Sequence, residues 1–270
     1  MNMLTVFKSM SWTARLGVLI IVVYAFMAVF GPYITPYNET QIVGGEYDPW
    51  NAQTWLGTDN LGRDMFSRLI FGARNTIGIA LLSTLLAFFM GGVLGLVAAT
   101  VGGWYEAVLS RLVDMLMSVP QLIGALLLLT IFGTSLLNLV FVIALVDATR
   151  IYRLAKSVAM NVMVTDYMEV ARLRGEGLYW LVFVELLPNV RAPLIAEFGL
   201  RFCFVFLTIS SLSFLGLGLQ PPMADWGSMV RENASLISFG DLTPLIPAAA
   251  IGVLAIAVNF VVDWFLAQRR

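Results

Sequence analysis

The sequence predicts an all-α integral membrane protein with six transmembrane helices and with both termini in the cytoplasm. Of its 270 residues, 59% are apolar and 12% are charged, whereas a soluble domain is typically about 45–50% apolar and roughly 25% charged. The apolar residues also gather into runs long enough to cross the hydrocarbon core of a bilayer. Basic residues lie mainly on one side of these runs, which gives the orientation.

Composition also excludes several classes of function. A formal net charge of −1 argues against a nucleic-acid partner, which needs a basic surface. With no histidine and with Cys203 as the single cysteine, most metal sites and all disulfide frameworks lack their ligands. No G-x-x-x-x-G-K-[ST] pattern occurs, so the chain has no P-loop for ATP. We therefore expect this chain to bind no cofactor.

Six apolar runs, each bounded by glycine, proline or charged residues, are predicted to cross the membrane. They cover residues 16–30, 77–101, 112–132, 136–155, 193–215 and 244–267. The first run is expected to end at Gly31-Pro32 and to stay uncleaved, because no small-residue cleavage site follows it. The chain then divides into a cytoplasmic N-terminus (1–15), a first transmembrane helix (16–30), an outer loop with an interfacial helix (31–75) and a five-helix core (76–270) that contains a cytoplasmic loop (156–192).

The orientation follows from Lys and Arg, which are retained on the cytoplasmic side. With the N-terminus inside, eleven of the sixteen basic residues are cytoplasmic: Lys8, Arg15, Arg111, Arg150, Arg153, Lys156, Arg172, Arg174, Arg191, Arg269 and Arg270. Four lie in the outer loops, namely Arg63, Arg68, Arg74 and Arg231. This asymmetry predicts that residues 33–75 are outside and that residues 156–192 are inside.

In the outer loop, a turn at residues 57–59 is expected to precede a short amphipathic helix. Its apolar side chains (Met65, Leu69 and Phe71) would enter the lipid boundary, while Arg63, Asp64 and Arg68 stay in water. Asp64 and Arg68 are spaced i,i+4 and can pair. One reading of this segment is a structural lid at the outer interface.

The cytoplasmic loop is predicted to hold two short helices that meet at a glycine-rich elbow. Asp166 can cap the first helix, whose first turn carries Glu169. Gly175 is expected to end that helix in the left-handed region, and the second helix, residues 178–187, is expected to stop before Pro188. The residues leave two readings open, an interfacial helix on lipid or a docking element for a soluble partner.

Each acidic residue in the spans has a basic residue nearby, which argues against a proton relay. The expected pairs are Asp114 with Arg111, Asp147 with Arg150, Glu197 with Arg201, and Asp263 with Arg269 or Arg270. A second set of polar residues could line a translocation path or bond a neighbouring helix: Ser118, Gln121, Arg201, Thr208 and Ser211. An intramembrane enzyme lacks the residues it would need. A secondary transporter would show an unpaired mid-membrane carboxylate or an inverted repeat, and we find neither.

Three sequence blocks carry a resemblance. Glu169-Val170-Ala171, three residues, Gly175, nine residues and Glu185-Leu186-Leu187-Pro188 resemble the EAA loop of ABC-importer permeases, which reads E-A-A, three residues, G, nine residues, I-x-L-P. Val170 and Glu185 depart from that pattern. Residues 55–64 (WLGTDNLGRD) and 213–222 (SFLGLGLQPP) are similar to signatures of the dipeptide/oligopeptide/nickel permease family, C-type subunit.

The resemblance implies a type I ABC-importer permease fold in a bacterial inner membrane. It implies a paired B-type permease, two ATPase subunits that hold ATP and Mg, and a periplasmic or lipid-anchored solute-binding protein. The cargo would be di- or oligopeptides, or else nickel chelates, glutathione or oligosaccharides. ATPase coupling would involve Asp166, Tyr167, Glu169, Val170, Ala171, Gly175, Leu187 and Pro188. Contact with the binding protein would involve Asp59, Arg63, Asp64, Asp225 and Trp226, with the structural lid as the alternative role of the outer block.

Overall fold

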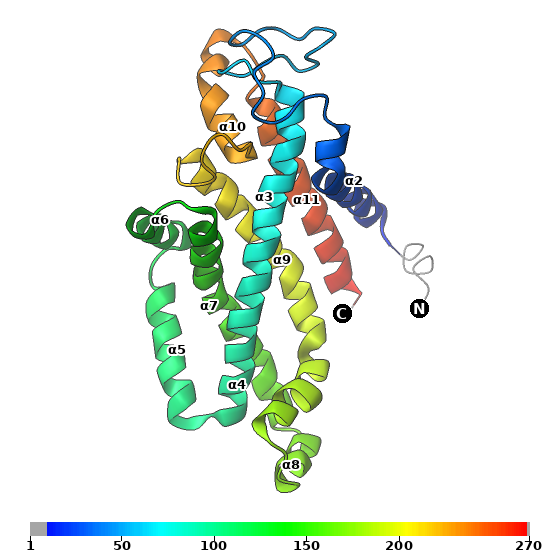
Figure 1. Cartoon of the computed structure of the whole chain (residues 1–270). Coiled ribbons are helices and arrows are strands. Elements are labelled where there is room, and N and C mark those ends of the chain that lie inside the picture. Colours follow the sequence, from blue (N-terminus) through cyan, green and yellow to red (C-terminus); the bar gives the residue numbers. More distant parts are fainter. Residues whose placement is uncertain (1–9, 269–270) are drawn as a thin grey trace.

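The computed structural model describes residues 10–268, and this part of the chain is all-helical, as predicted. Its elements are α2 (Trp12–Ile34), α3 (Met65–Ala87), η1 (Phe88–Gly92), α4 (Val93–Val101), α5 (Gly103–Met117), α6 (Gln121–Phe132), α7 (Leu136–Met163), α8 (Asp166–Leu173), η2 (Trp180–Leu186), α9 (Leu187–Phe214), α10 (Trp226–Asn233), η3 (Ala234–Phe239) and α11 (Leu245–Ala267). Figure 1 shows an elongated bundle with α10 and the loop before α3 at one end and α8 at the other. We call the loop 35–64 the lid.

Four helical segments of the described chain are long and apolar enough to cross a membrane: Trp12–Ile34, Met65–Val101, Trp180–Phe214 and Leu245–Ala267. The pair α5 and α6 adds a fifth if both belong to one span. Helix α7 has 28 residues, but Asp147, Arg150 and Arg153 lie inside it. Length and composition thus support four or five spans within residues 10–268, and the count of six stays a prediction.

The predicted third span, residues 112–132, is not a single helix. α5 ends at Met117, α6 begins at Gln121, and the two are bent by 90°. Pro120 stands before the first residue of α6 in a non-helical conformation (φ −54°, ψ 132°). Proline has no N–H to donate to the preceding turn and disfavours helical geometry in the residue before it, so the helix breaks there.

The second predicted span is longer than expected. α3, η1 and α4 form one helical rod over Met65–Val101, 37 residues or about 55 Å. The expected interfacial helix after residue 59 is therefore wrong, because Met65 begins the rod and is fully buried. At the π-helical turn η1, Gly91 lies directly against the carbonyl of Ala148 on α7, where no side chain would fit. The rod and α7 thus pack backbone against backbone.

Two other boundaries differ from the prediction. α2 continues through Pro32 to Ile34, since a proline in the last turn removes only one helical hydrogen bond. The expected second loop helix does not stop before Pro188, because η2 runs directly into α9. Pro188 is the second residue of α9, directly after the π-helical turn η2.

The largest buried cluster joins α3, α7, α9, α10 and α11, with Phe206 and Trp226 among its fully buried side chains. Trp226 begins α10 and lies against Gly72 of α3, where an added Cβ would stand 2.7 Å from the indole. A smaller cluster at the other end joins Leu96 of α4 to Ala155 of α7 and Val182 of η2. These two clusters hold the two ends of the rod in place.

Candidate functional site

At one end of the bundle, α8 is a short helix with two different faces. Met168 and Ala171 are buried and pack with Leu181 of η2. On the other face, Tyr167, Val170 and Leu173 are 40%, 51% and 81% exposed. A contiguous apolar face left open to solvent is typical of an interaction surface.

The elbow after α8 has the predicted geometry at Gly175. Its φ is +78°, and its N–H donates to the carbonyl of Arg172 at 2.9 Å while the N–H of Glu176 donates to that of Ala171 at 3.3 Å. These bonds satisfy carbonyls at the end of the helix. The carboxylate of Glu185 connects the two sides of the elbow. It accepts a hydrogen bond from the indole N–H of Trp180 at 3.2 Å and lies 3.6 Å from the guanidinium of Arg174.

The structure gathers six of the eight predicted coupling residues in α8 and its elbow: Asp166, Tyr167, Glu169, Val170, Ala171 and Gly175. Leu187 and Pro188 lie instead in the first turn of α9. Asp166 is the first residue of α8 and not its cap. Thr165 occupies the N-cap position without a capping side-chain hydrogen bond, and its hydroxyl donates instead to the carbonyl of Val162 at 2.6 Å. Ala171 faces the bundle and is buried, so it anchors the helix to the bundle.

A contact that the sequence did not predict ties α8 to the rod. The guanidinium of Arg172 donates to the backbone carbonyl of Thr100, in the last turn of α4, at 2.9 Å. The last four carbonyls of a helix have no N–H one turn further along the same helix, and a cation there is favoured by the helix dipole. The sequence placed Arg172 only among the basic residues that set the orientation of the chain.

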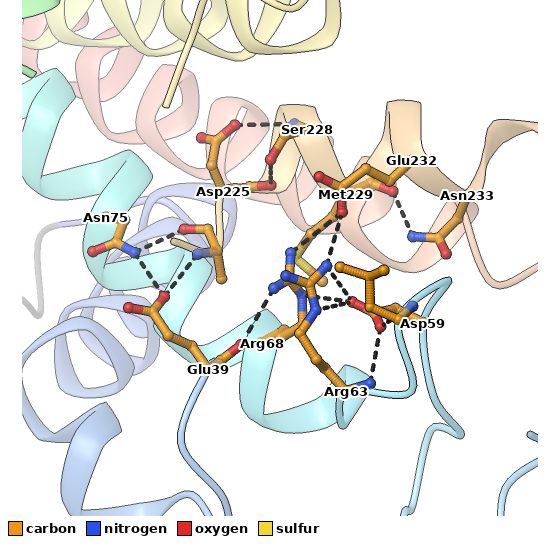
Figure 2. Close-up of polar contacts among 12 residues, drawn as sticks. Glu39, Asp59, Arg63, Arg68, Asn75, Asp225, Ser228, Met229, Glu232 and Asn233 are labelled. Carbon is orange, nitrogen blue, oxygen red and sulfur yellow. Dashed lines mark hydrogen bonds and ion pairs between the residues drawn. The ribbon is translucent and has the colours of Figure 1, made fainter. Parts of the chain in front are cut away.

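At the opposite end, a buried ionic cluster holds the lid to α3 and α10 (Figure 2). The carboxylate of Asp59 lies 2.7 Å from the guanidinium of Arg63 and 3.1 Å from that of Arg68. Glu232 of α10 lies 3.4 Å from Arg63 and 3.3 Å from Arg68. The side chain of Arg68 is 1% exposed and that of Glu232 is 13% exposed, so two cations and two anions compensate one another largely away from water.

A second group of contacts extends this cluster. Glu39 of the lid accepts from the side-chain amide of Asn75 at 3.2 Å and from the N–H of Ala224 at 2.7 Å. Asp225 caps α10 through the N–H of Ser228 at 3.0 Å and accepts from the hydroxyl of Thr76 at 2.8 Å. Burial raises the pKa of the Asp225 carboxyl, and its hydrogen bonds act in the opposite direction. The lid, α3 and α10 are thereby joined by side chains from all three.

The expectation that Arg63, Asp64 and Arg68 stay in water is wrong, because all three are buried. Asp64 does not pair with Arg68; it caps α3 by accepting from the N–H of Ser67 at 2.8 Å. All five residues expected to contact a binding protein are buried within the chain: Asp59, Arg63, Asp64, Asp225 and Trp226. Asp59 and Arg63 join the lid to Arg68 of α3 and Glu232 of α10. Asp225 and Trp226 join α10 to α3. These contacts fit the alternative, structural role of the outer block.

The polar residues of the spans pair differently from the prediction. Arg150 bonds Gln121 of α6, Arg153 lies 3.5 Å from Asp114, and Arg201 lies 3.7 Å from Asp147. Arg111 and Arg150 were expected for these two acids, but the packing of α5 and α9 against α7 brings Arg153 and Arg201 nearer. The predicted pair Glu197–Arg201 is confirmed at 2.5 Å. The partners expected for Asp263 lie outside the described residues.

The remaining path candidates bond within their own helices. The hydroxyls of Thr208 and Ser211 donate to the carbonyls of Phe204 and Leu207, and that of Ser118 donates to the carbonyl of Met115. Ser211 also lines a cavity of about 410 Å³ between α9, α10 and α11. Within residues 10–268, no group of three or more His, Cys, Asp or Glu side chains is placed to hold a metal ion.

Two family models match the chain. Residues 91–268 match the binding-protein-dependent transport system inner membrane component. Residues 10–53 match the N-terminal TM domain of oligopeptide transport permease C. The first match contains α8 and the elbow, and the second contains α2 and most of the lid.

Curated relatives are similar over nearly the whole chain. The dipeptide transport system permease protein DppC of Alkalihalophilus pseudofirmus is 32% identical over 252 residues, covering 93% of this chain and 83% of the relative. The di/tripeptide transport system permease protein DppC of Pseudomonas aeruginosa is 34% identical, covering 92% and 84%. The glutathione transport system permease protein GsiD of Pectobacterium atrosepticum is 32% identical, covering 93% and 83%.

Proposed function

The chain belongs to the family of binding-protein-dependent transport system inner membrane components, and from this premise we propose that it is the C-type permease subunit of an importer of short peptides. It is a multi-pass protein of the inner membrane. Relatives named for dipeptides and di/tripeptides motivate the cargo class. Nickel chelates, glutathione and oligosaccharides are the alternative cargoes.

We propose that the chain forms the translocation path with a B-type permease and docks two ATPase subunits, which hold ATP and Mg. A solute-binding protein would deliver the cargo at the lid. The observation that carries this assignment is α8, a short helix that leaves Tyr167, Val170 and Leu173 exposed and ends at a left-handed Gly175. A short amphipathic helix of this kind fits a groove on a partner protein.

Purification of the affinity-tagged chain from its native membranes tests this function. We expect a second permease and two ATPase subunits to copurify in fixed stoichiometry. In proteoliposomes, uptake of a radiolabelled dipeptide should require both ATP and the binding protein, with unlabelled glutathione and a nickel chelate as competitors. Uptake by the chain without ATPase subunits, driven by an ion gradient, would instead support a function of another class, that of a stand-alone secondary transporter or channel.

Two single cysteines test the predicted six-span topology. Gly45 in the lid and Gly177 in the elbow are both exposed, so each would be replaced by cysteine in a Cys203→Ser background. Three predicted crossings separate them, and we expect an impermeant maleimide added to intact spheroplasts to label only the cysteine at position 45. If α7 or the bent pair α5–α6 did not cross the membrane, both positions would lie on one side and would react alike.

A further inference from the structure

The rod Met65–Val101 joins the two ends of the bundle. At its N-terminal end, Arg68 binds the lid through Asp59 and α10 through Glu232. Trp226 of α10 donates to the carbonyl of Leu69 on the same rod at 2.8 Å. Figure 1 shows the rod running from this end of the molecule to the neighbourhood of α8.

The C-terminal end of the rod is packed against the elements that flank α8. An added Cβ on Gly95 would stand 2.7 Å from the carbonyl of Tyr152 on α7. Leu96 is buried in the cluster with Ala155 and Val182. The hydroxyl of Thr100 donates to the carbonyl of Leu96 at 2.9 Å and lies 4.0 Å from the sulfur of Met163. The last turn of α4 is therefore held by close packing. Its final carbonyls point along the helix axis, beyond the C-terminal end of α4.

α8 itself is attached in two ways besides its chain connections. Met168 and Ala171 supply a small apolar contact with η2 and the end of α7. Arg172 supplies a directional contact, because its guanidinium donates a hydrogen bond to the carbonyl of Thr100 at 2.9 Å. A cation that bonds the carbonyl end of a helix combines a charge-assisted hydrogen bond with the helix dipole. This bond therefore couples a displacement of α8 to the end of α4.

We propose that Arg172 is a positioning residue that transmits movement between α8 and the rod, and through the rod to the lid. Because α8 is an ATPase docking helix only under the proposed permease function, the inference rests on that function. Nucleotide-driven displacement of α8 would move the last turn of α4 with it through Arg172. Since Arg68 anchors the other end of the same rod, the arrival of a loaded binding protein at the lid would reach α8 by the same route.

Variants at Arg172 and Arg174 in the complete complex separate transmission from docking. Arg172→Met keeps an unbranched apolar stem and removes the guanidinium donor, and Arg172→Lys keeps the charge. Arg174→Met is the matched control, because Arg174 is two residues away, is 58% exposed and makes only a long ion pair with Glu185. For Arg172→Met we expect wild-type ATPase stoichiometry and basal ATPase rate, with stimulation by loaded binding protein reduced about tenfold, the size expected for one charge-assisted hydrogen bond. Arg172→Lys should recover part of the stimulation, and Arg174→Met should retain it.

Each other outcome has a defined meaning. Full stimulation in Arg172→Met would overturn the inference, and so would loss of the ATPase subunits, which would make Arg172 a docking contact. A wild-type complex without ATPase subunits would refute the proposed function itself. A second measurement uses two spin labels, at positions 101 and 177, in a Cys203→Ser background. With Arg172 intact, the distance between the two labels should be the same with and without ATP and vanadate. In Arg172→Met that distance should change with nucleotide, and an unchanged distance would also count against the inference.

Discussion

Replacement of Gly175 by valine is expected to lower ATP-driven uptake by about 5- to 30-fold, the factor that corresponds to a strain of 1–2 kcal/mol. Gly175 has φ +78°. This conformation is unfavourable for residues that carry a Cβ, and most unfavourable for β-branched residues. No atom lies within 4 Å of the position where a Cβ would stand. The expected strain therefore comes from the backbone conformation and not from steric crowding. It affects the turn that sets the orientation of α8.

Two control variants isolate this cause. Gly177→Val adds the same side chain two residues further on, where the Cβ also meets no neighbour and φ is not positive. Gly175→Asn tests the left-handed conformation, because asparagine tolerates it better than other residues with a Cβ. We expect both controls to retain uptake and binding-protein-stimulated ATPase. Wild-type uptake by Gly175→Val, or an equal loss in Gly177→Val, would contradict the assigned role of the turn.

Removal of the Arg68 guanidinium is expected to lower the free energy of unfolding more than the substitutions at Gly175 or Arg172. Arg68 lies 3.1 Å from Asp59 and 3.3 Å from Glu232, and it donates to the carbonyl of Glu39 at 3.3 Å. Without it, the buried carboxylate of Asp59 and the partly buried carboxylate of Glu232 share Arg63 alone. Leaving a buried charge without its partner typically costs about 3–5 kcal/mol, and we expect Arg68→Met to fall near the lower value because Arg63 remains.

The thermal unfolding midpoint of the detergent-solubilised protein measures this effect. Arg74→Met is the matched control, since Arg74 lies on the same helix and is exposed. Arg68→Lys keeps the charge but cannot reach three acceptors with a planar fork, so an intermediate midpoint is expected. If Arg68→Met and Arg74→Met unfolded at the same temperature, the cluster would not stabilise the lid.

Several features were predictable because they depend on neighbours in sequence. Composition and the length of the apolar runs gave the all-helical membrane class. The left-handed turn at Gly175 and the short helix before it followed from local helix-ending and helix-starting signals. The pair Glu197–Arg201 followed from its i,i+4 spacing. The EAA-like spacing also placed the candidate coupling helix close to where the structure has α8.

Other features were decided only by tertiary structure. Arg63 and Glu232 are 169 residues apart, and Arg172 and Thr100 are 72 apart, so no local pattern could join them. The same holds for the lid, whose charged residues were expected in water because charge alone usually indicates a surface. Burial of a charge becomes tolerable only when opposite charges and donors from other elements surround it. Those partners come together here because α10 packs between α3, α9 and α11, and that packing depends on side-chain shape across the whole bundle.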